Sequence, residues 1–128
     1  WGGLVRGNRA DLLPLVEAGV LGFKAFMIDS GVEEFPWADE ATLRDGMRAL
    51  AGTGVPVLAH AELDGGIAVP AASHAGSRAY RTWLDARPVQ WETNAVRLLV
   101  RLVRDTGCAA HVVHVAFGTV AITSPLYG

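Results

Sequence analysis

The chain has 128 residues, the usual size of one domain, with 51% hydrophobic residues, 19% charged residues and a net charge of −2. This balance includes no basic patch or run of like charge, which argues against nucleic acid or a membrane surface as a partner. No apolar run reaches the roughly 18 residues of a membrane span. The single cysteine, Cys108, excludes an intrachain disulfide and fits a reducing compartment, so we expect a cytoplasmic protein.

The amino-terminal part predicts a strand followed by a helix. Residues 1–5 look like the end of a strand that runs into a loop. Asn8 is placed to cap a helix with an apolar face at 12–16, and Gly19 is placed to end it. Pro14 is compatible with that helix only within its first turn, where no internal hydrogen bond is lost.

An apolar stretch at 20–28 predicts a strand with a cation in its middle, Lys24, the only lysine of the chain. Burying an ammonium group is costly unless the group is neutralised or paired, so Lys24 is a candidate chemical group. The alternative is an edge strand whose lysine points to solvent. The polar loop from Asp29 to Asp39 is longer than a simple connection, and such loops often carry binding groups.

The remaining elements alternate between helices and strands. Asp39 caps a helix in which Leu43, Met47, Leu50 and Ala51 recur at helical spacing, and Gly52 stops it. There follow a strand at 55–62, a loop at 65–76, helices at 78–86 and 89–105, and a strand at 109–115. The apolar stripe predicted for the last helix consists of Val96, Leu99, Val100 and Val103.

Apolar strands separated by amphipathic helices indicate an α/β protein built from parallel βαβ units. No Gly-rich phosphate motif follows a strand, which disfavours a dinucleotide-binding fold. We therefore expect a partial (β/α)8 TIM barrel with about three to four of its eight strands, since a closed barrel typically needs about 250 residues. The sequence would then be part of a longer protein, and alone it would be marginally stable.

Three strands carry Lys24, His60 and His114 at or near their carboxyl ends, where barrels build active sites. Ligands that converge from separate strands can hold a catalytic metal. A lysine with a lowered pKa can react with carbon dioxide to form a carbamate, which is an anionic oxygen ligand.

Plainer interpretations exist for each polar residue of the strands. His60 can be a satisfied core histidine, and Glu62 can either orient a neighbouring ligand or lie in solvent. His111 and His114 are three residues apart, so on a strand they face opposite sides and one of them is structural. His74 is expected to be exposed in its loop.

Other conspicuous side chains have structural interpretations. We expect Trp37, Trp83 and Trp91 to anchor the packing, Glu33 and Glu34 to be solvated, and Cys108 to be buried.

Several motifs together carry a resemblance: Trp-Gly-Gly-Leu-Val at 1–5 with Asn8, Gly-Phe-Lys at 22–24, Ser-Gly-Val-Glu-Glu-Phe-Pro at 30–36, His-Ala-Glu at 60–62, Trp-Leu-Asp-Ala-Arg-Pro at 83–88 and His-Val-Val-His at 111–114. From Trp1 to about Ala116 the chain resembles the middle of an allantoinase, one of the cyclic amidohydrolases, which include dihydropyrimidinase and dihydroorotase. The 1–5 and 30–36 motifs resemble allantoinases in particular.

The resemblance implies a binuclear metal site, usually of two zinc ions, bridged by a carboxylated Lys24 and a hydroxide. His60 and His114 match metal ligands, whereas His111 does not, and Glu62 and Ser30 match supporting or substrate-loop positions. The implied reaction opens the ring of the small-molecule substrate allantoin to give allantoate, in purine catabolism. The complete enzyme is expected to be a homo-oligomer, a tetramer.

The chain also departs from the family pattern. The family's His-x-His pair would precede residue 1, and its aspartate base would follow residue 128, so no catalytic base is identified. Ala116 stands where the family usually has serine. We expect a partial barrel at 1–116 and a non-matching tail at 117–128. The alternatives are a dihydropyrimidinase-like or dihydroorotase-like hydrolase and a non-catalytic remnant.

Overall fold

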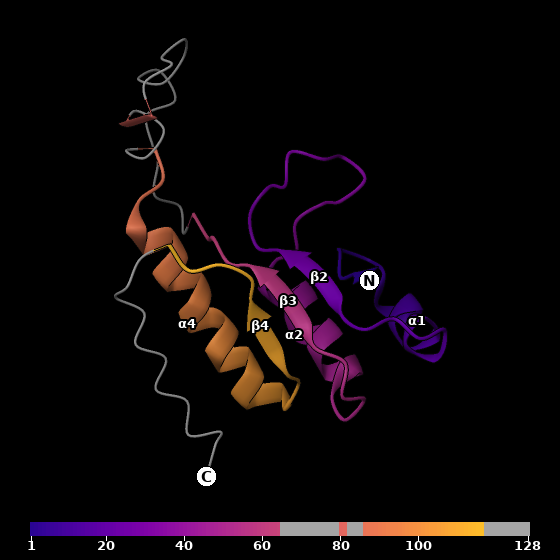
Figure 1. Ribbon diagram of the computed structural model, residues 1–128. Coiled ribbons are helices and arrows are strands. Elements are labelled where there is room, and N and C mark those ends of the chain that lie inside the picture. The colour runs from indigo at the N-terminus through magenta and orange to yellow at the C-terminus, as the bar shows by residue number, and fades with distance from the viewer. Residues whose placement is uncertain (65–79, 82–85, 117–128) are drawn as a thin grey trace.

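The computed structural model describes residues 1–64, 80–81 and 86–116 (Figure 1). Within these residues the chain forms a parallel sheet with the strand order β1-β2-β3-β4. The strands are β1 (Gly2–Gly3), β2 (Phe23–Phe26), β3 (Val57–His60) and β4 (Ala110–Val112). Strands that follow one another in the sequence are therefore neighbours in the sheet, and the predicted α/β class with parallel strands is confirmed.

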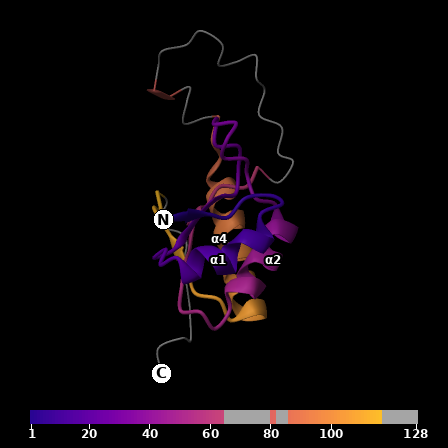
Figure 2. The ribbon, with the colours of Figure 1, turned by 90° about the vertical axis from the view of Figure 1, so that its right-hand side faces the viewer.

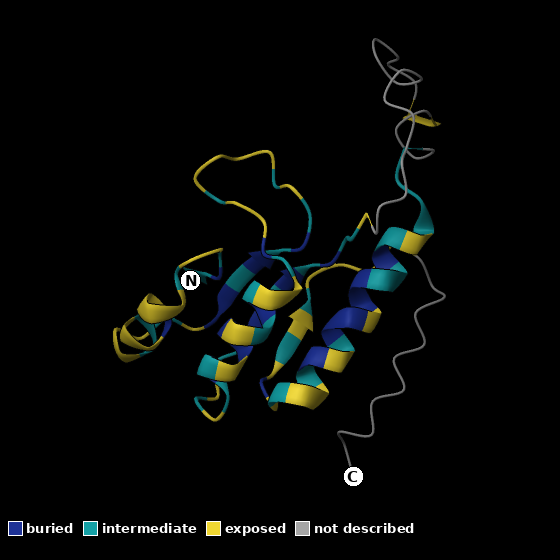
Figure 3. Ribbon diagram, turned by 180° about the vertical axis from the view of Figure 1, so that it is seen from behind, coloured by how far each residue is buried: buried dark blue, intermediate teal, exposed yellow. Residues whose placement is uncertain are grey.

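Helices connect the strands and cover one face of the sheet. They are the 3-10 helix η1 (Arg9–Asp11), α1 (Leu12–Glu17), α2 (Glu40–Leu50) and α4 (Val89–Thr106). Seen from behind, α2 and α4 lie side by side in front of the strands (Figure 3). In a (β/α) barrel each new strand is added on the same side of the previous one, and all helices lie on one face of the sheet. In a doubly wound sheet the strand order reverses partway and helices cover both faces. The order observed here is that of a barrel.

The two faces of the central strands differ in burial because successive side chains of a strand alternate between them. The face under the helices is fully buried and consists of Phe23, Ala25, Val57 and Ala59. The opposite face is half-exposed and consists of Lys24, Phe26, Leu58 and His60. The register pairs Lys24 with Leu58 and Phe26 with His60, so these four side chains share the open face.

Helix α2 begins as its sequence predicts. The Asp39 carboxylate accepts a hydrogen bond from the Thr42 backbone N–H at 2.8 Å, which caps the helix. The helix ends at Leu50, and Gly52 follows with a φ of 80°, a left-handed conformation that favours glycine. Gly46 lies against Leu4, since a Cβ there would stand 2.3 Å from Leu4 Cδ1.

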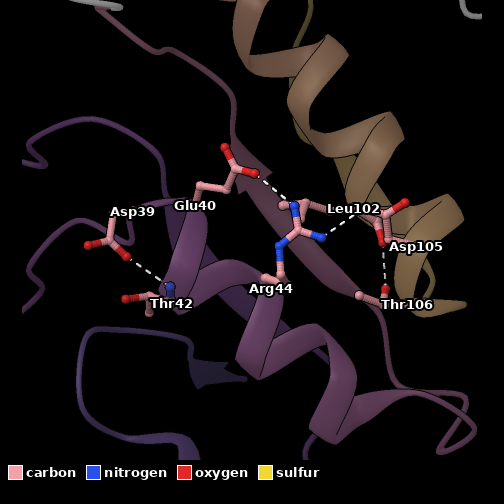
Figure 4. A network of polar contacts seen from close by, with 7 residues as sticks. All are labelled: Asp39, Glu40, Thr42, Arg44, Leu102, Asp105 and Thr106. Carbon is pink, nitrogen blue, oxygen red and sulfur yellow. Dashed lines mark hydrogen bonds and ion pairs between the residues drawn. The ribbon is translucent and has the colours of Figure 1, made fainter.

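Polar contacts between α2 and α4 fix the relative position of the two helices (Figure 4). Arg44 of α2 donates to Asp105 of α4 at 2.7 Å and to Glu40 of its own helix at 2.7 Å. Helix α4 ends at Thr106, whose hydroxyl donates to the Leu102 carbonyl, and Gly107 closes the helix with a φ of 73°. The exposed ion pairs add specificity of packing more than stability.

The start of the chain departs from the prediction. Asn8 does not cap a helix with its side chain. Instead its Oδ1 accepts from the Val5 N–H at 3.1 Å and its Nδ2 donates to the Gly3 carbonyl at 2.9 Å, which closes the turn after β1. Pro14 is the third residue of α1, within the first turn, where its missing N–H costs nothing. Figure 2 shows α1 and α2 after a turn of 90° from the view of Figure 1.

The face of α4 that packs on the sheet is broader than predicted. Val96 and Leu99 are buried as expected, but Ala95, Leu98 and Leu102 are buried as well. Val100 and Val103 are only partly buried at the margin of the core.

Side chains outside the helices follow their predictions in most cases. Cys108 is buried, and this burial raises the pKa of its thiol to about 11. Glu33 and Glu34 are exposed. Trp37 was expected to anchor the packing but is 39% exposed, with the Arg6 guanidinium 5.2 Å from the centre of its ring.

Some predictions concern positions outside the described residues: the loop at 65–76 with His74, most of the helix at 78–86 with Trp83, and the tail at 117–128. None of the helices within the described ranges has the length and hydropathy needed to cross a bilayer.

Candidate metal centre

Two histidines from neighbouring strands meet at the carboxyl end of the sheet. His60 is the last residue of β3, and His114 follows the end of β4. Nε2 of His114 lies 3.0 Å from Nδ1 of His60, and the two rings meet edge to face with their centroids 4.7 Å apart. The structure thus brings together two of the three residues that were predicted to converge.

His111 lies elsewhere on the same sheet. It pairs with Leu58 in the register and is exposed on the open face, further from the carboxyl end than His60. The prediction that His111 and His114 face opposite sides is wrong, because it requires a strand to residue 115 and β4 ends at Val112. Alternation therefore does not decide which way His114 points, and its contact with His60 does.

Lys24 was expected at or near the carboxyl end of its strand, but it is the second of the four residues of β2 and pairs with Leu58, two residues before His60. Strand β2 has β1 on one side and β3 on the other. The alternative of an edge strand is thus excluded. The side chain is half-buried, and its Nζ lies 4.8 Å from the centre of the Phe26 ring. Burial lowers the pKa of Lys24, which is the direction that favours the neutral, nucleophilic amine.

His60 is held by contacts on several sides. Its ring lies 5.3 Å from that of Phe26, and its Nε2 lies 3.1 Å from Oε1 of Glu62. Burial lowers the pKa of His60 below its ordinary 6.5, although the Glu62 carboxylate acts in the opposite direction. The net lowering favours the neutral ring. With the Nε2–H donated to Glu62, the lone pair of Nδ1 faces His114.

Glu62 is not a solvated residue at a strand end. Its Oε1 contacts His60, and its Oε2 forms an ion pair with Arg87 Nη1, with 18% of the Glu62 side chain exposed. A carboxylate that holds the second nitrogen of an imidazole fixes the tautomer and orientation of the ring, as commonly occurs around metal sites.

The loop between β2 and α2 folds against the same end of the sheet. The Ser30 hydroxyl donates to the Phe35 carbonyl at 2.7 Å and accepts from the Val32 N–H at 3.1 Å. Phe35 packs its ring edge to face on Phe26, 5.3 Å between centroids. Ser30 thus shapes the loop, and Phe35 extends the aromatic wall that begins at His60.

A cavity of about 520 Å³ opens between these elements. Its walls include the two histidines, Glu62, Phe26 and Ser30. This volume is within the range of about 300–1,000 Å³ that is usual for small-molecule sites. The cavity lies at the carboxyl ends of the strands, where barrel enzymes bind their substrates.

Several residues that line the cavity were not predicted as site residues, among them Arg87, Trp91 and Glu92. Trp91 had been assigned to packing, and it is half-buried. Glu92 is only 6% exposed. In the sequence it is not distinctive, because acidic residues are common in the first turn of a helix, where the helix dipole favours them. Only the fold brings these residues to the strand ends.

The spacing of the two imidazole nitrogens suits a zinc ion. Two nitrogens bound to one tetrahedral zinc at about 2.0–2.1 Å lie roughly 3.3 Å apart, close to the observed 3.0 Å between His60 and His114. Within the described part of the chain no three His, Cys, Asp or Glu side chains converge to hold a metal. The two histidines fit part of such a site, and the described residues add no third ligand of these four types.

The fold and this site define a segment of a hydantoinase-type (β/α) barrel. The chain superposes on an L-hydantoinase (dihydropyrimidinase) from Arthrobacter aurescens with a TM-score of 0.78 and 28% identity, covering 89% of this chain and 26% of that one. It also superposes on a D-hydantoinase with a TM-score of 0.65 and 24% identity, over 84% of this chain and 23% of that one, a likeness of fold alone.

The relatives in sequence are allantoinases. The chain is 47% identical over 120 residues to an allantoinase of Solibacter usitatus, covering 92% of this chain and 26% of that protein. It is 42% identical over 116 residues to a mitochondrial allantoinase of Aquarana catesbeiana, covering 91% of this chain and 24% of that protein. No family model matches the sequence. The chain is similar to these allantoinases over nearly its whole length, and it spans about a quarter of their length.

Proposed function

We propose that the protein to which these strands belong hydrolyses a cyclic amide, and that its substrate is allantoin, which is opened to allantoate. The observation that carries this proposal is the meeting of His60 Nδ1 and His114 Nε2 at 3.0 Å on the wall of the cavity. The names of the sequence relatives support the choice of substrate.

The proposed metal ligands are His60, His114 and Lys24, with Lys24 carboxylated and bridging two zinc ions in the complete enzyme. The lowered pKa of Lys24 supports carbamate formation, because only the neutral amine attacks carbon dioxide. The chemistry that such a centre supplies is polarisation of the amide carbonyl and a lowered pKa for water.

The protein's own residues prepare the site for this chemistry. The lone pair of His60 Nδ1 is free to bind a metal, because Glu62 accepts a hydrogen bond from the Nε2–H of the same ring. Phe26 lines the cavity, and the ring of Phe35 packs edge to face against it. Ser30 holds the loop that carries Phe35 in place. The domain division at 116, the homotetramer and the cytoplasmic location remain predictions.

The metal site can be tested on the 128-residue chain, expressed with zinc and bicarbonate, by metal analysis and intact mass under non-denaturing conditions. We expect about one zinc per chain and a mass increase of one carbon dioxide, both lost in Lys24→Ala. His111→Ala serves as the matched control, because this histidine lies on the same face without contacting His60, and should keep both. Equal zinc in Lys24→Ala and the unaltered chain would contradict the assignment.

The substrate can be tested on the longer enzyme by comparing the hydrolysis of allantoin with that of dihydrouracil. We expect a clear preference for allantoin. The second candidate is a dihydropyrimidinase-like hydrolase, favoured by the structural likeness to the Arthrobacter aurescens enzyme. Preferred hydrolysis of dihydrouracil would establish that candidate instead.

A further inference from the structure

The amino-terminal end of α4 reaches both segments that carry the paired histidines. Arg87 precedes the helix by two residues, and Trp91 and Glu92 lie in its first turn. We call these three residues the α4 clamp. Each makes a contact with the chain just beyond β3 or β4, and the three contacts differ in kind.

Two contacts hold the segment that follows β3. Arg87 Nη1 forms an ion pair with Oε2 of Glu62, which leaves Oε1 directed at Nε2 of His60. The carbonyl of Trp91 accepts a hydrogen bond from the Leu63 N–H at 3.1 Å. The backbone of Leu63 and the Oε2 atom of Glu62 are thus both held by the clamp. This leaves Oε1 of Glu62 as the atom that contacts His60.

The third contact holds the segment that follows β4. Glu92 Oε2 accepts a hydrogen bond from the Ala116 N–H at 2.8 Å, two residues beyond His114. The strand has ended at Val112, and the Val113 N–H donates a hydrogen bond to the Ala59 carbonyl of β3 at 3.2 Å. A carboxylate that is 6% exposed is costly to bury, so its hydrogen bonds matter to the fold around it.

We propose that the α4 clamp sets the spacing and orientation of the two histidines, with Arg87 and Glu92 as positioning residues. Arg87 acts on His60 through Glu62, and Glu92 acts on His114 through the backbone of Ala116. The consequence for zinc affinity rests on the function proposed above. The consequence for the geometry of the histidines does not.

The first experiment measures zinc dissociation constants of the 128-residue chain by competition with a chelating dye. We expect Arg87→Met and Glu92→Leu each to bind zinc about 10–100-fold more weakly, the range typical of groups that support metal ligands. Glu92→Gln keeps an oxygen acceptor for the Ala116 N–H and should restore most of the affinity. Arg101→Met, an exposed arginine on the same helix, should change nothing. Far-ultraviolet circular dichroism confirms that each variant keeps its helices.

The second experiment reads the histidines without metal, by nitrogen-15 NMR of the imidazole rings. We expect His60 in the unaltered chain to carry its proton on Nε2, and Arg87→Met to show a mixture of both tautomers. This outcome supports the clamp even when the unaltered chain binds no zinc, a result that would count only against the proposed metal site. An unchanged tautomer in Arg87→Met, with zinc affinities equal to those of Arg101→Met, would overturn the clamp while leaving the metal site intact.

Discussion

The two faces of the central strands share one backbone but differ in burial and in the kind of side chain that they carry. On β2, Phe23 lies fully buried beneath the helices, and Phe26 lies half-exposed beside His60, three residues further along. The helix-covered face is closed and apolar, and its burial provides the main stabilising contribution. The open face carries Lys24, and at its carboxyl end Phe26 and His60 line a cavity. The difference shows that a parallel βα sheet can separate stability from chemistry by the alternation of side chains alone.

The largest expected effect comes from the closed face. Phe23→Ala leaves a cavity in the core and should lower the free energy of unfolding by about 3–5 kcal/mol, measured by urea denaturation. A loss below about 1 kcal/mol would mean that this face is not the core.

The matched substitution on the open face is Phe26→Ala. We expect it to lower the free energy of unfolding by only about 1–1.5 kcal/mol, because it removes ring contacts with Phe35 and His60 without opening the core. The same urea titration measures it. A loss as large as that of Phe23→Ala would break the distinction between the two faces.

A smaller effect concerns the helix that covers the closed face. Asp39→Ala removes the cap of α2 and should cost about 1 kcal/mol. Hydrogen bonds from Thr42, followed by the Arg6 charge, hold the pKa of Asp39 below its ordinary 3.8. The stabilisation is therefore complete above that pH and disappears as the pH falls through the lowered pKa of the folded state. Urea titrations at pH 7 and pH 3 should show the difference between the two proteins shrinking, and a constant difference would contradict the role of the charge.

The smallest expected change in stability accompanies a large change in function. Lys24→Met replaces a half-buried cation with an apolar side chain of similar length, and should change the free energy of unfolding by less than about 0.5 kcal/mol. Metal analysis of the same sample should nevertheless show zinc binding lost. Retained zinc would contradict the assignment of Lys24 as a metal ligand.

Much of the fold follows from local patterns in the sequence. The cap at Asp39, the stop at Gly107 and the apolar strands around Lys24 and His60 each depend on neighbouring residues only, and each is where the sequence predicts. The parallel order of the strands follows from the helices between them, since such connections bring successive strands together.

The parts that sequence reasoning missed depend on contacts between distant segments. Arg87 lies 25 residues from Glu62, and Glu92 lies 24 residues from Ala116, so no local pattern reveals either partner. Asn8 was misassigned because a side chain that can cap a helix can equally close a turn, and the tertiary context decides between them. His114 contacts His60 because β4 ends early, which hydrophobic alternation does not predict.

The most direct test of the separation between the faces is the increase in the free energy of unfolding that zinc produces. At a free zinc concentration of about 100 times its dissociation constant, binding to the folded state alone adds about 2.7 kcal/mol. We expect the unaltered chain and Phe23→Ala to gain this same increment from different starting stabilities, and His60→Ala to gain none. An increment that survives in His60→Ala, or that disappears in Phe23→Ala while the protein remains folded, would contradict the account.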